Sequence, residues 1–181
     1  MKYQHQCGEP RKQMRWKDFD YCSQGVYFVT IVTYERRCLF GNIVNGEMEL
    51  NDAGKMVLHK YQSLESDAVN CMDIVVMPNH VHFMVYIPHD GAMNLSRVVH
   101  CFKSLTTKYY AQGVRERGWA PFDGSLWQRG YWDDIVWNGR MFDFIRRYIY
   151  LNPERWSKDS INVEHESDVD HICECLKKLK H

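Results

Sequence analysis

Two histidines, a tyrosine and an asparagine have the types and spacing of a site for phosphodiester chemistry. His80 and His82 are two residues apart, Tyr148 follows 66 residues after His82, and Asn152 lies four residues after Tyr148. Side chains two apart on a strand point to the same face, so the two imidazoles form half of a metal site. A phenol and an amide four apart on a helix also share a face. The pattern predicts a tyrosine nucleophile beside a bound metal ion.

Each half of this pattern also fits a purely structural interpretation. With nine histidines in the chain, about 0.4 His-x-His pairs are expected by chance, and such a pair also suits two hydrogen-bonded core residues. A tyrosine in the aromatic-rich segment 142–150 commonly packs rather than reacts. Asn152 favours Tyr148 because it is the metal-competent residue that precedes Pro153, whereas Tyr150 would pair with Glu154 beyond that proline. Glu154 is the stronger type of ligand, so the Tyr150–Glu154 pair stays open.

The first half of the chain reads as strands around one helix. Residues 27–34 are rich in aromatic and β-branched types and predict a strand. Asn45-Gly46 predicts a type I′ hairpin turn, and Asn51 or Asp52 can cap a helix that follows. Residues 71–77 and 80–87 predict two antiparallel strands separated by the turn at Pro78-Asn79.

The second half adds two helices and one strand. Asn94 can cap a long helix with a buried apolar stripe, and residues 127–137 predict a fourth strand. Residues 139–152 predict a helix that ends before Pro153, because the residue before a proline disfavours the helical conformation. The order β-α-β-β-α-β followed by α predicts an α+β fold of the ferredoxin-like, split βαβ plan with an extra carboxyl-terminal helix.

The strand over residues 80–87 is expected to have two different faces. Its odd-numbered residues are apolar and need helices over them, whereas His80, His82, Met84 and Tyr86 line the opposite face. We therefore expect the histidine face to lie away from the main helical cover.

The net charge of zero conceals an uneven distribution. Residues 1–17 carry five basic residues against one acidic, and residues 97–155 carry ten against six, so each segment is about +4. Residues 159–174 hold six acidic residues and no basic one. Basic segments suit a nucleic-acid partner, although each charged run alone also fits an ordinary solvated face.

The composition predicts a single-domain cytoplasmic protein. The polar first 17 residues show no secretory signal, and no apolar run is long enough to span a membrane. The seven cysteines are scattered and odd in number, which favours reduced thiols. Cys173 and Cys175 lie near three histidines, but their spacing fits no common zinc module.

An ordered series of motifs resembles the single-tyrosine HUH transposases, and within them the REP-associated tyrosine transposases. The similarity extends over roughly residues 20–157, in the same order as in that family. The motifs that carry it are Val75-Val76-Met77-Pro78-Asn79-His80-Val81-His82-Phe83-Met84-Val85, Phe102-Lys103-Ser104, Trp127-Gln128-Arg129 and Arg147-Tyr148-Ile149-Tyr150-Leu151-Asn152-Pro153-Glu154-Arg155-Trp156. Residues 135–140 match only loosely, and the acidic segment after Ser157 has no counterpart.

The resemblance implies roles for individual residues. His80, His82 and Asn152 would hold Mg²⁺ or Mn²⁺, and Tyr148 would attack single-stranded DNA next to a hairpin through a 5′-phosphotyrosine intermediate. Phosphate-binding and base-stacking candidates are expected among basic and aromatic residues. These candidates are Arg11, Lys12, Arg15, Lys103, Lys108, Arg129, Arg146 and Arg147 for phosphates, with Trp127 and Tyr131 for stacking.

The expected organisation is a basic arm over residues 1–20, an HUH transposase domain over 21–157 and an acidic tail over 158–181. The chain would act as a monomer or homodimer on single-stranded or hairpin DNA, without a membrane partner. A catalytically silent hairpin-binding protein of transposase descent is the main alternative. A metal-binding or purely structural protein is a third possibility.

Overall fold

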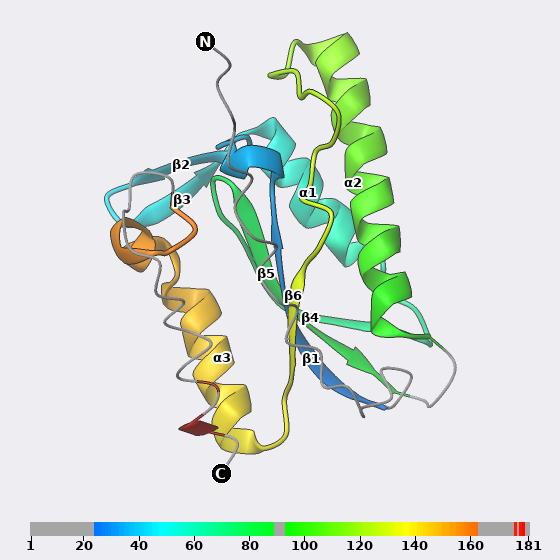
Figure 1. Ribbon diagram of the computed structural model, residues 1–181, viewed down its shortest axis with the longest axis vertical. Helices are drawn as coiled ribbons and strands as arrows, with labels where there is room; N and C mark the ends of the chain where they lie inside the picture. The colour runs from blue at the N-terminus through cyan, green and yellow to red at the C-terminus, as the bar shows by residue number, and fades with distance from the viewer. Residues whose placement is uncertain (1–23, 89–92, 163–175, 177, 180–181) are drawn as a thin grey trace, which may run out of the picture.

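A computed structural model describes residues 24–88, 93–162, 176, 178 and 179 (Figure 1). The described chain is an α+β protein with one four-stranded antiparallel sheet and one separate hairpin. None of its helices is long and apolar enough to cross a membrane. The elements in chain order are β1 (Gly25–Val32), η1 (Tyr34–Arg36), β2 (Gly41–Val44), β3 (Glu47–Leu50), α1 (Asp52–Gln62), β4 (Asn70–Val76), β5 (His80–Ile87), α2 (Leu95–Arg117), β6 (Trp132–Ile135), α3 (Gly139–Leu151) and η2 (Pro153–Lys158).

The sheet has the strand order β4-β5-β1-β6, so β5 and β1 are its two central strands. Each neighbouring pair is antiparallel. With α1 between β1 and β4 and α2 between β5 and β6, this connectivity agrees with the predicted β-α-β-β-α-β series. Strand β5 pairs on both edges, so its histidines lie on a strand that neighbours fix from both sides.

The sheet separates two hydrophobic clusters, as the alternation in β5 predicted. Val81, Phe83 and Val85 belong to the larger cluster, which α1 and α2 complete on one face. On the other face Phe28 and Met84 pack against Met141, Ile145 and Ile149 of α3. Figure 1 shows α1 and α2 on one side of the sheet and α3 on the other. The histidine face is therefore covered by α3, with Leu176 and Leu179 packed in the same cluster.

Asparagine side chains cap α1, α2 and α3 at their amino ends. Asn51 accepts from the Gly54 amide, Asn94 from the Arg97 amide and Asn138 from the Met141 amide. Each bond satisfies one backbone N–H that the first helical turn leaves without a partner. The hairpin turn is also as predicted, because Asn45 and Gly46 both have positive φ, 53° and 82°.

The fourth strand is shorter than the predicted residues 127–137. Trp127 forms an isolated bridge with Thr33, and regular pairing with β1 resumes only at Trp132. Between these points the Lys103 ammonium donates hydrogen bonds to the carbonyls of Gln128 and Gly130, at 2.9 and 2.7 Å. Those carbonyls point to a side chain instead of a neighbouring strand, which interrupts the ladder.

Gly54 provides a test of the packing between α1 and the hairpin. A Cβ atom at Gly54 would lie 2.2 Å from the Phe40 carbonyl oxygen, whereas a Cβ at Gly139 meets nothing within 4 Å. We expect Gly54→Ala to lower the free energy of unfolding by about 1–3 kcal/mol. Gly139→Ala, at the start of α3, should raise it by up to about 1 kcal/mol. Urea denaturation of both variants checks the prediction, and equal effects would contradict the described approach of α1 to residue 40.

Candidate active site

Strand β5 and helix α3 bring the predicted histidines and tyrosine together. His80 and His82 are buried, and their ring centroids are 4.5 Å apart. The Tyr148 hydroxyl lies 3.2 Å from Nε2 of His82. Phe28 stacks on His82 and meets the Tyr148 ring edge-on. Residues 66 positions apart in the sequence thus form one continuous cluster on the α3 face of the sheet.

Asn152 lies at the carboxyl end of α3, directly before Pro153. Its side chain is 1% exposed and neighbours His80. The Oδ1 atom of Asn152 has no hydrogen-bond partner among the described residues. A buried carbonyl oxygen without a donor is costly, and a cation supplies the charge that such an atom lacks.

Asn79 determines which nitrogen of His80 carries the proton. The Asn79 amide donates to the carbonyls of Arg36 and Ile161, each at 3.0 Å, so its Oδ1 faces Nδ1 of His80 at 2.9 Å. That oxygen can only accept, and Nδ1 must therefore be the donor. The Nε2 atom of His80 is left with a lone pair in a buried position, and no residue that the structure describes forms a hydrogen bond with it. This tautomer suits a metal ligand.

Thr30 orients the second imidazole from the neighbouring strand. Its hydroxyl is 2.7 Å from Nδ1 of His82, and the two residues face each other in the β1–β5 pairing. When the hydroxyl accepts from Nδ1, the Nε2 atom of His82 presents its lone pair toward Tyr148. Both imidazoles therefore have one nitrogen tied to a side chain and one nitrogen directed into the site.

Burial keeps both imidazoles neutral. It lowers the pKa of His80 to about 3, with the Asn152 side chain acting in the opposite direction. Burial also lowers the pKa of His82 well below its usual value, and the nearby His80 adds to this effect while Asp159 opposes it. Neutral imidazole is the form that binds metal ions.

Asp159 completes the cluster and was missed by the sequence analysis. Its carboxylate oxygen Oδ2 lies 3.7 Å from Nε2 of His80, and its side chain is 7% exposed. Ligand atoms of Asp159, His80 and His82 all lie within 4.8 Å of one another. The sequence presents Asp159 only as the first of six acidic residues, with no spacing that links it to the histidines. The donors of two imidazoles, an amide and a carboxylate fit a hard divalent cation.

The described beginning of the expected acidic tail packs against the domain. The Arg36 guanidinium donates to the Ser160 carbonyl at 3.2 Å, and the Asn162 side chain is buried and donates to the Trp156 carbonyl. Arg36 and the Asn79 side chain, which donates to the Ile161 carbonyl, therefore hold residues 160 and 161 against the domain. Residues 163–175, 177, 180 and 181 lie outside the described residues, as do Cys173, Cys175 and most of the proposed tail.

The alternative pair of Tyr150 and Glu154 is not brought to the histidines. Tyr150 is 81% exposed. Glu154 lies beside Gly46 of the β2–β3 turn, where a Cβ on the glycine would be 3.7 Å from Glu154 Cγ. Two residues along a helix correspond to about 200° of rotation, which explains why Tyr148 and Tyr150 face different directions.

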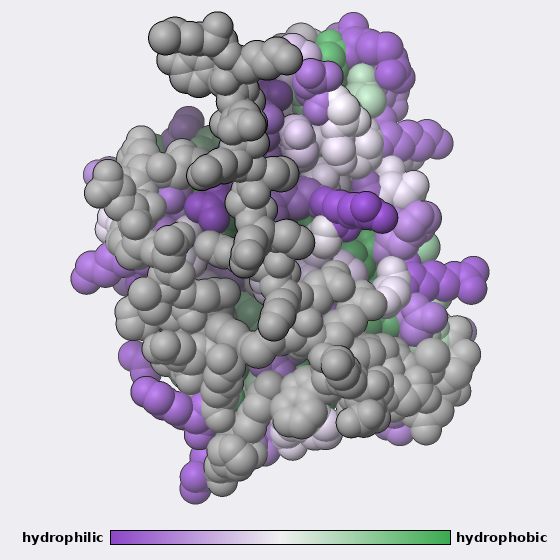
Figure 2. Space-filling model, in the orientation of Figure 1, coloured by the Kyte–Doolittle hydropathy of each residue, from purple (hydrophilic) through white to green (hydrophobic). Residues whose placement is uncertain are grey.

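The candidate phosphate-binding residues have different environments. Arg129 and Arg147 are exposed, and Lys108 is exposed on the hydrophilic outer face of α2, whose edge is visible in Figure 2. Arg146 is exposed and pairs with Asp73 at 3.2 Å.

Lys103 donates to the carbonyls of residues 128–130, and burial lowers its pKa to about 8. Lys103 therefore stabilises the loop and is not presented to a phosphate. Arg11, Lys12, Arg15 and the rest of the basic arm over residues 1–20 lie outside the described residues.

The two candidate stacking residues also differ. Trp127 is 3% exposed, and its indole N–H donates to Thr106 at 2.8 Å. Its ring packs in the larger core and is not available to a base, so the expectation that Trp127 stacks on DNA was wrong. Tyr131 is half-buried at the surface, with its hydroxyl 3.1 Å from that of Ser96.

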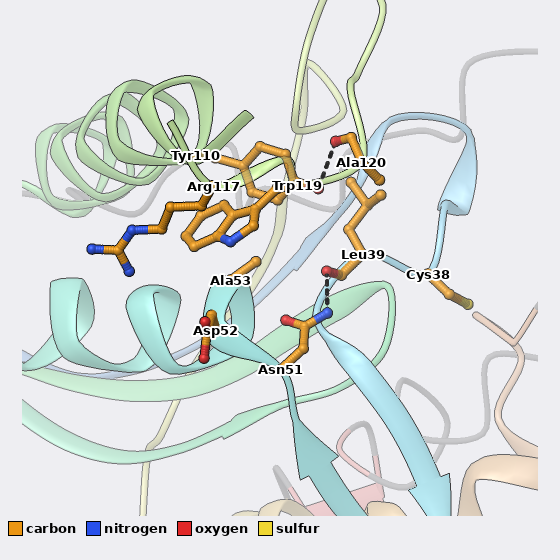
Figure 3. A pocket seen from close by; sticks show the side chains of 9 residues that line it. All are labelled: Cys38, Leu39, Asn51, Asp52, Ala53, Tyr110, Arg117, Trp119 and Ala120. Atoms are coloured by element: carbon orange, nitrogen blue, oxygen red, sulfur yellow. Dashed lines mark hydrogen bonds between the residues drawn. The ribbon is translucent and has the colours of Figure 1, made fainter. Parts of the chain in front are cut away.

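A separate pocket lies on the opposite side of the sheet. Figure 3 shows it between the chain before β2, the start of α1 and the end of α2. Its volume is about 430 Å³. Hydrogen bonds from Asn51 to Leu39 and from Tyr110 to Ala120 hold its walls. Neither histidine nor Tyr148 lines it, so the candidate active site is not this pocket.

The described chain is an α+β protein in which a strand with two histidines faces a helix with a tyrosine. A sequence profile of the family described as Transposase IS200 like matches residues 22–152. The chain therefore belongs to the IS200-like transposase family, and the resemblance noted from its motifs is confirmed.

Two relatives and one solved structure are similar to this chain. An uncharacterized protein of Haemophilus influenzae is 31% identical over 169 residues, which cover 85% of this chain and 94% of the relative. A second protein of the same organism, provisionally named a REP-associated tyrosine transposase, is 23% identical over 74% of this chain and 73% of its own length. A solved structure of a REP-associated tyrosine transposase bound to a REP hairpin has a TM-score of 0.53 and 21% identity, covering 81% of this chain and 74% of that one. This last similarity concerns the fold.

The buried neutral histidines predict how stability depends on pH without metal. In the unfolded chain each imidazole binds a proton near pH 6.5, whereas in the folded protein His80 does so only near pH 3. Stability is therefore complete above about pH 6.5 and falls toward lower pH by up to about 1.4 kcal/mol per pH unit for each such histidine. Urea denaturation with a chelator, between about pH 6.5 and 4.5, measures this slope.

Two variants make the pH experiment specific. His80→Gln should reduce the slope, because it removes one group that protonates only on unfolding. His59→Gln should leave it unchanged, since His59 is exposed on α1. A slope in His80→Gln as steep as that of the unmodified protein would contradict the assignment of a neutral, buried His80.

Proposed function

We propose that this protein is a metal-dependent single-strand DNA endonuclease and strand transferase that acts at hairpin or repeat DNA through a 5′-phosphotyrosine intermediate. The observation that carries the proposal is the placement of the Tyr148 hydroxyl 3.2 Å from the buried His82, beside His80 and Asn152. Membership of the IS200-like transposase family supports an enzyme that acts on DNA. The hairpin bound by the solved relative supports hairpin DNA as the partner.

His80, His82 and Asn152 would hold Mg²⁺ or Mn²⁺. Nε2 of His80 and Oδ1 of Asn152 are buried acceptors to which no described residue donates, which fits a cation at this position. When bound, the ion would supply Lewis-acid polarisation of the scissile phosphate. Asn79 and Thr30 would keep the two imidazoles in the tautomer and orientation that binding requires.

Tyr148 would attack the phosphorus of single-stranded DNA. Its phenol loses a proton, the new bond joins the phenolic oxygen to phosphorus, and the bond from phosphorus to the 3′-oxygen breaks. The 3′-oxygen leaves as a hydroxyl after gaining a proton, and the 5′ end stays on the protein. Because the phosphotyrosyl bond retains the energy of the broken phosphodiester, a second 3′-hydroxyl can reverse the step, so strand transfer requires no nucleotide cofactor.

DNA binding would use exposed cations of the described chain. Arg129, Arg147 and Lys108 are exposed, and Arg146 can exchange its partner Asp73 for a phosphate. Tyr131 remains a proposed stacking residue. We propose action in the cytoplasm as a monomer or homodimer, with the basic arm over residues 1–20 adding phosphate contacts.

Removing one hydroxyl group tests the nucleophile. Tyr148→Phe should still fold and bind hairpin DNA, because the ring contacts with Phe28 and His82 remain, yet it should form no covalent adduct. The assay incubates the protein and Mn²⁺ with single-stranded hairpin oligonucleotides of the repeats that flank its gene. A denaturing gel then separates free protein from protein joined to DNA.

Tyr150→Phe is the matched control on the same helix and should keep most of the activity, because Tyr150 is exposed and faces away from the histidines. Adduct formed by Tyr148→Phe but not by Tyr150→Phe would contradict the proposal. Hairpin binding without any adduct from the unmodified protein would favour the alternative, a catalytically silent hairpin-binding protein.

A further inference from the structure

The carboxylate of Asp159 lies beside the two histidines. It comes from a part of the chain that the sequence motifs do not include. Its Oδ2 atom is 3.7 Å from Nε2 of His80, and its side chain is almost fully buried. The ligand atoms of Asp159, His80 and His82 lie within 4.8 Å of one another. These distances suit three groups that share one small ion.

Without an ion, this arrangement places the acceptor atoms of His80, Asp159 and Asn152 close together, and no described residue donates a hydrogen bond to Nε2 of His80 or Oδ1 of Asn152. Nε2 of His80 carries a lone pair because Nδ1 donates to Asn79, so it has nothing to donate to the carboxylate. The separation of 3.7 Å is also too long for a hydrogen bond. Among the described residues neither Nε2 of His80 nor the buried Oδ1 of Asn152 has a hydrogen-bond partner. Three converging electron-rich atoms lack a positive charge between them.

The local backbone holds Asp159 in this position. Its Oδ1 atom accepts from the Ile161 amide at 2.8 Å, and its own amide donates to the Trp156 carbonyl at 3.1 Å. The Asn79 side chain donates to the Ile161 carbonyl and also contacts Nδ1 of His80. One amide group therefore fixes both the histidine and the loop that carries the carboxylate, which leaves Oδ2 as the oxygen directed at the site.

We propose that Asp159 is a fourth protein ligand of the divalent ion, together with His80, His82 and Asn152. This inference rests on the proposed function and adds to the site the one ligand that carries a full negative charge. An anionic oxygen increases the affinity for Mg²⁺ and Mn²⁺ over that of two imidazoles and an amide. It also joins the loop after α3 to the strand that carries the histidines.

Asp159→Asn tests the proposal with little change in shape. The new side chain keeps the oxygen that accepts from the Ile161 amide, and it replaces Oδ2 with an N–H group facing the lone pair of His80. Titration calorimetry with Mn²⁺ alone should give a dissociation constant larger by roughly tenfold or more. The melting temperature of the metal-free protein should stay the same or rise, because the variant removes a buried negative charge and places an N–H group, in place of an acceptor, opposite Nε2 of His80. A merely structural role would lower the metal-free melting temperature, whereas a ligand role lowers the affinity for Mn²⁺ without lowering that temperature.

Two further variants make the result unambiguous. Asp143→Asn removes the same charge from an exposed position on α3 and should leave Mn²⁺ binding unchanged. Asp159→Ser keeps a short oxygen acceptor for the turn but cannot reach the ion, and it should weaken binding as Asp159→Asn does. Both readouts, calorimetry and metal-free melting, apply to every variant.

The outcomes separate this inference from the proposed function. Weaker Mn²⁺ binding with unchanged or higher metal-free stability supports Asp159 as a ligand. Unchanged binding in both Asp159 variants, with binding lost in His80→Ala, would overturn the inference and leave the proposed function in place. Weaker binding matched by an equal loss of metal-free stability would assign Asp159 to the fold and also overturn it. Absence of Mn²⁺ binding by the unmodified protein would overturn both.

Discussion

The packing of α3 against the histidine face of the sheet is the contact on which the site depends. Met141, Ile145 and Ile149 of α3 are buried against Phe28 and Met84 of the two central strands. Burying a large apolar side chain stabilises a fold by about 1.5–3 kcal/mol, so this small cluster fixes both the rotation and the depth of the helix. Since residues three and four apart share a helix face, the same rotation turns Tyr148 toward His82 and Asn152 toward His80.

Polar contacts then define the chemistry inside this apolar frame. Asn79 and Thr30 each hold one nitrogen of an imidazole and leave the other nitrogen directed into the site. Burial keeps the imidazoles neutral, which makes them ligands instead of cations. The turn at Pro78-Asn79 is itself held by backbone bonds from Leu39 and Phe40 to the Pro78 carbonyl. The Pro-Asn dipeptide thus acts as a support for His80 as well as a turn between strands.

Most of the fold and the central cluster could be predicted because they depend on local patterns. Alternation in residues 80–87 located the histidine face, and candidate caps at residues 51 and 94 located the first two helices. Pro153 located the end of the third helix, and the spacing of Tyr148 and Asn152 located the helix face that meets the histidines. The predicted start of the fourth strand was wrong because Lys103, 25 residues earlier than Gln128, takes up the carbonyls there. Trp127 was expected to stack on DNA because aromatic type alone does not distinguish a core ring from an exposed one. Asp159 could not be found from the sequence, since only the folded loop brings it to His80.

Identification of the residue that becomes joined to DNA tests the central claim most directly. The protein is trapped with a hairpin oligonucleotide, the adduct is digested, and mass spectrometry locates the nucleotide-bearing peptide and residue. The account predicts DNA attached through its 5′ phosphate to Tyr148, together with a released fragment whose free 3′-hydroxyl a polymerase can extend. DNA attached to Tyr150, or released ends that carry a 5′-hydroxyl, would contradict both the nucleophile and the direction of the reaction.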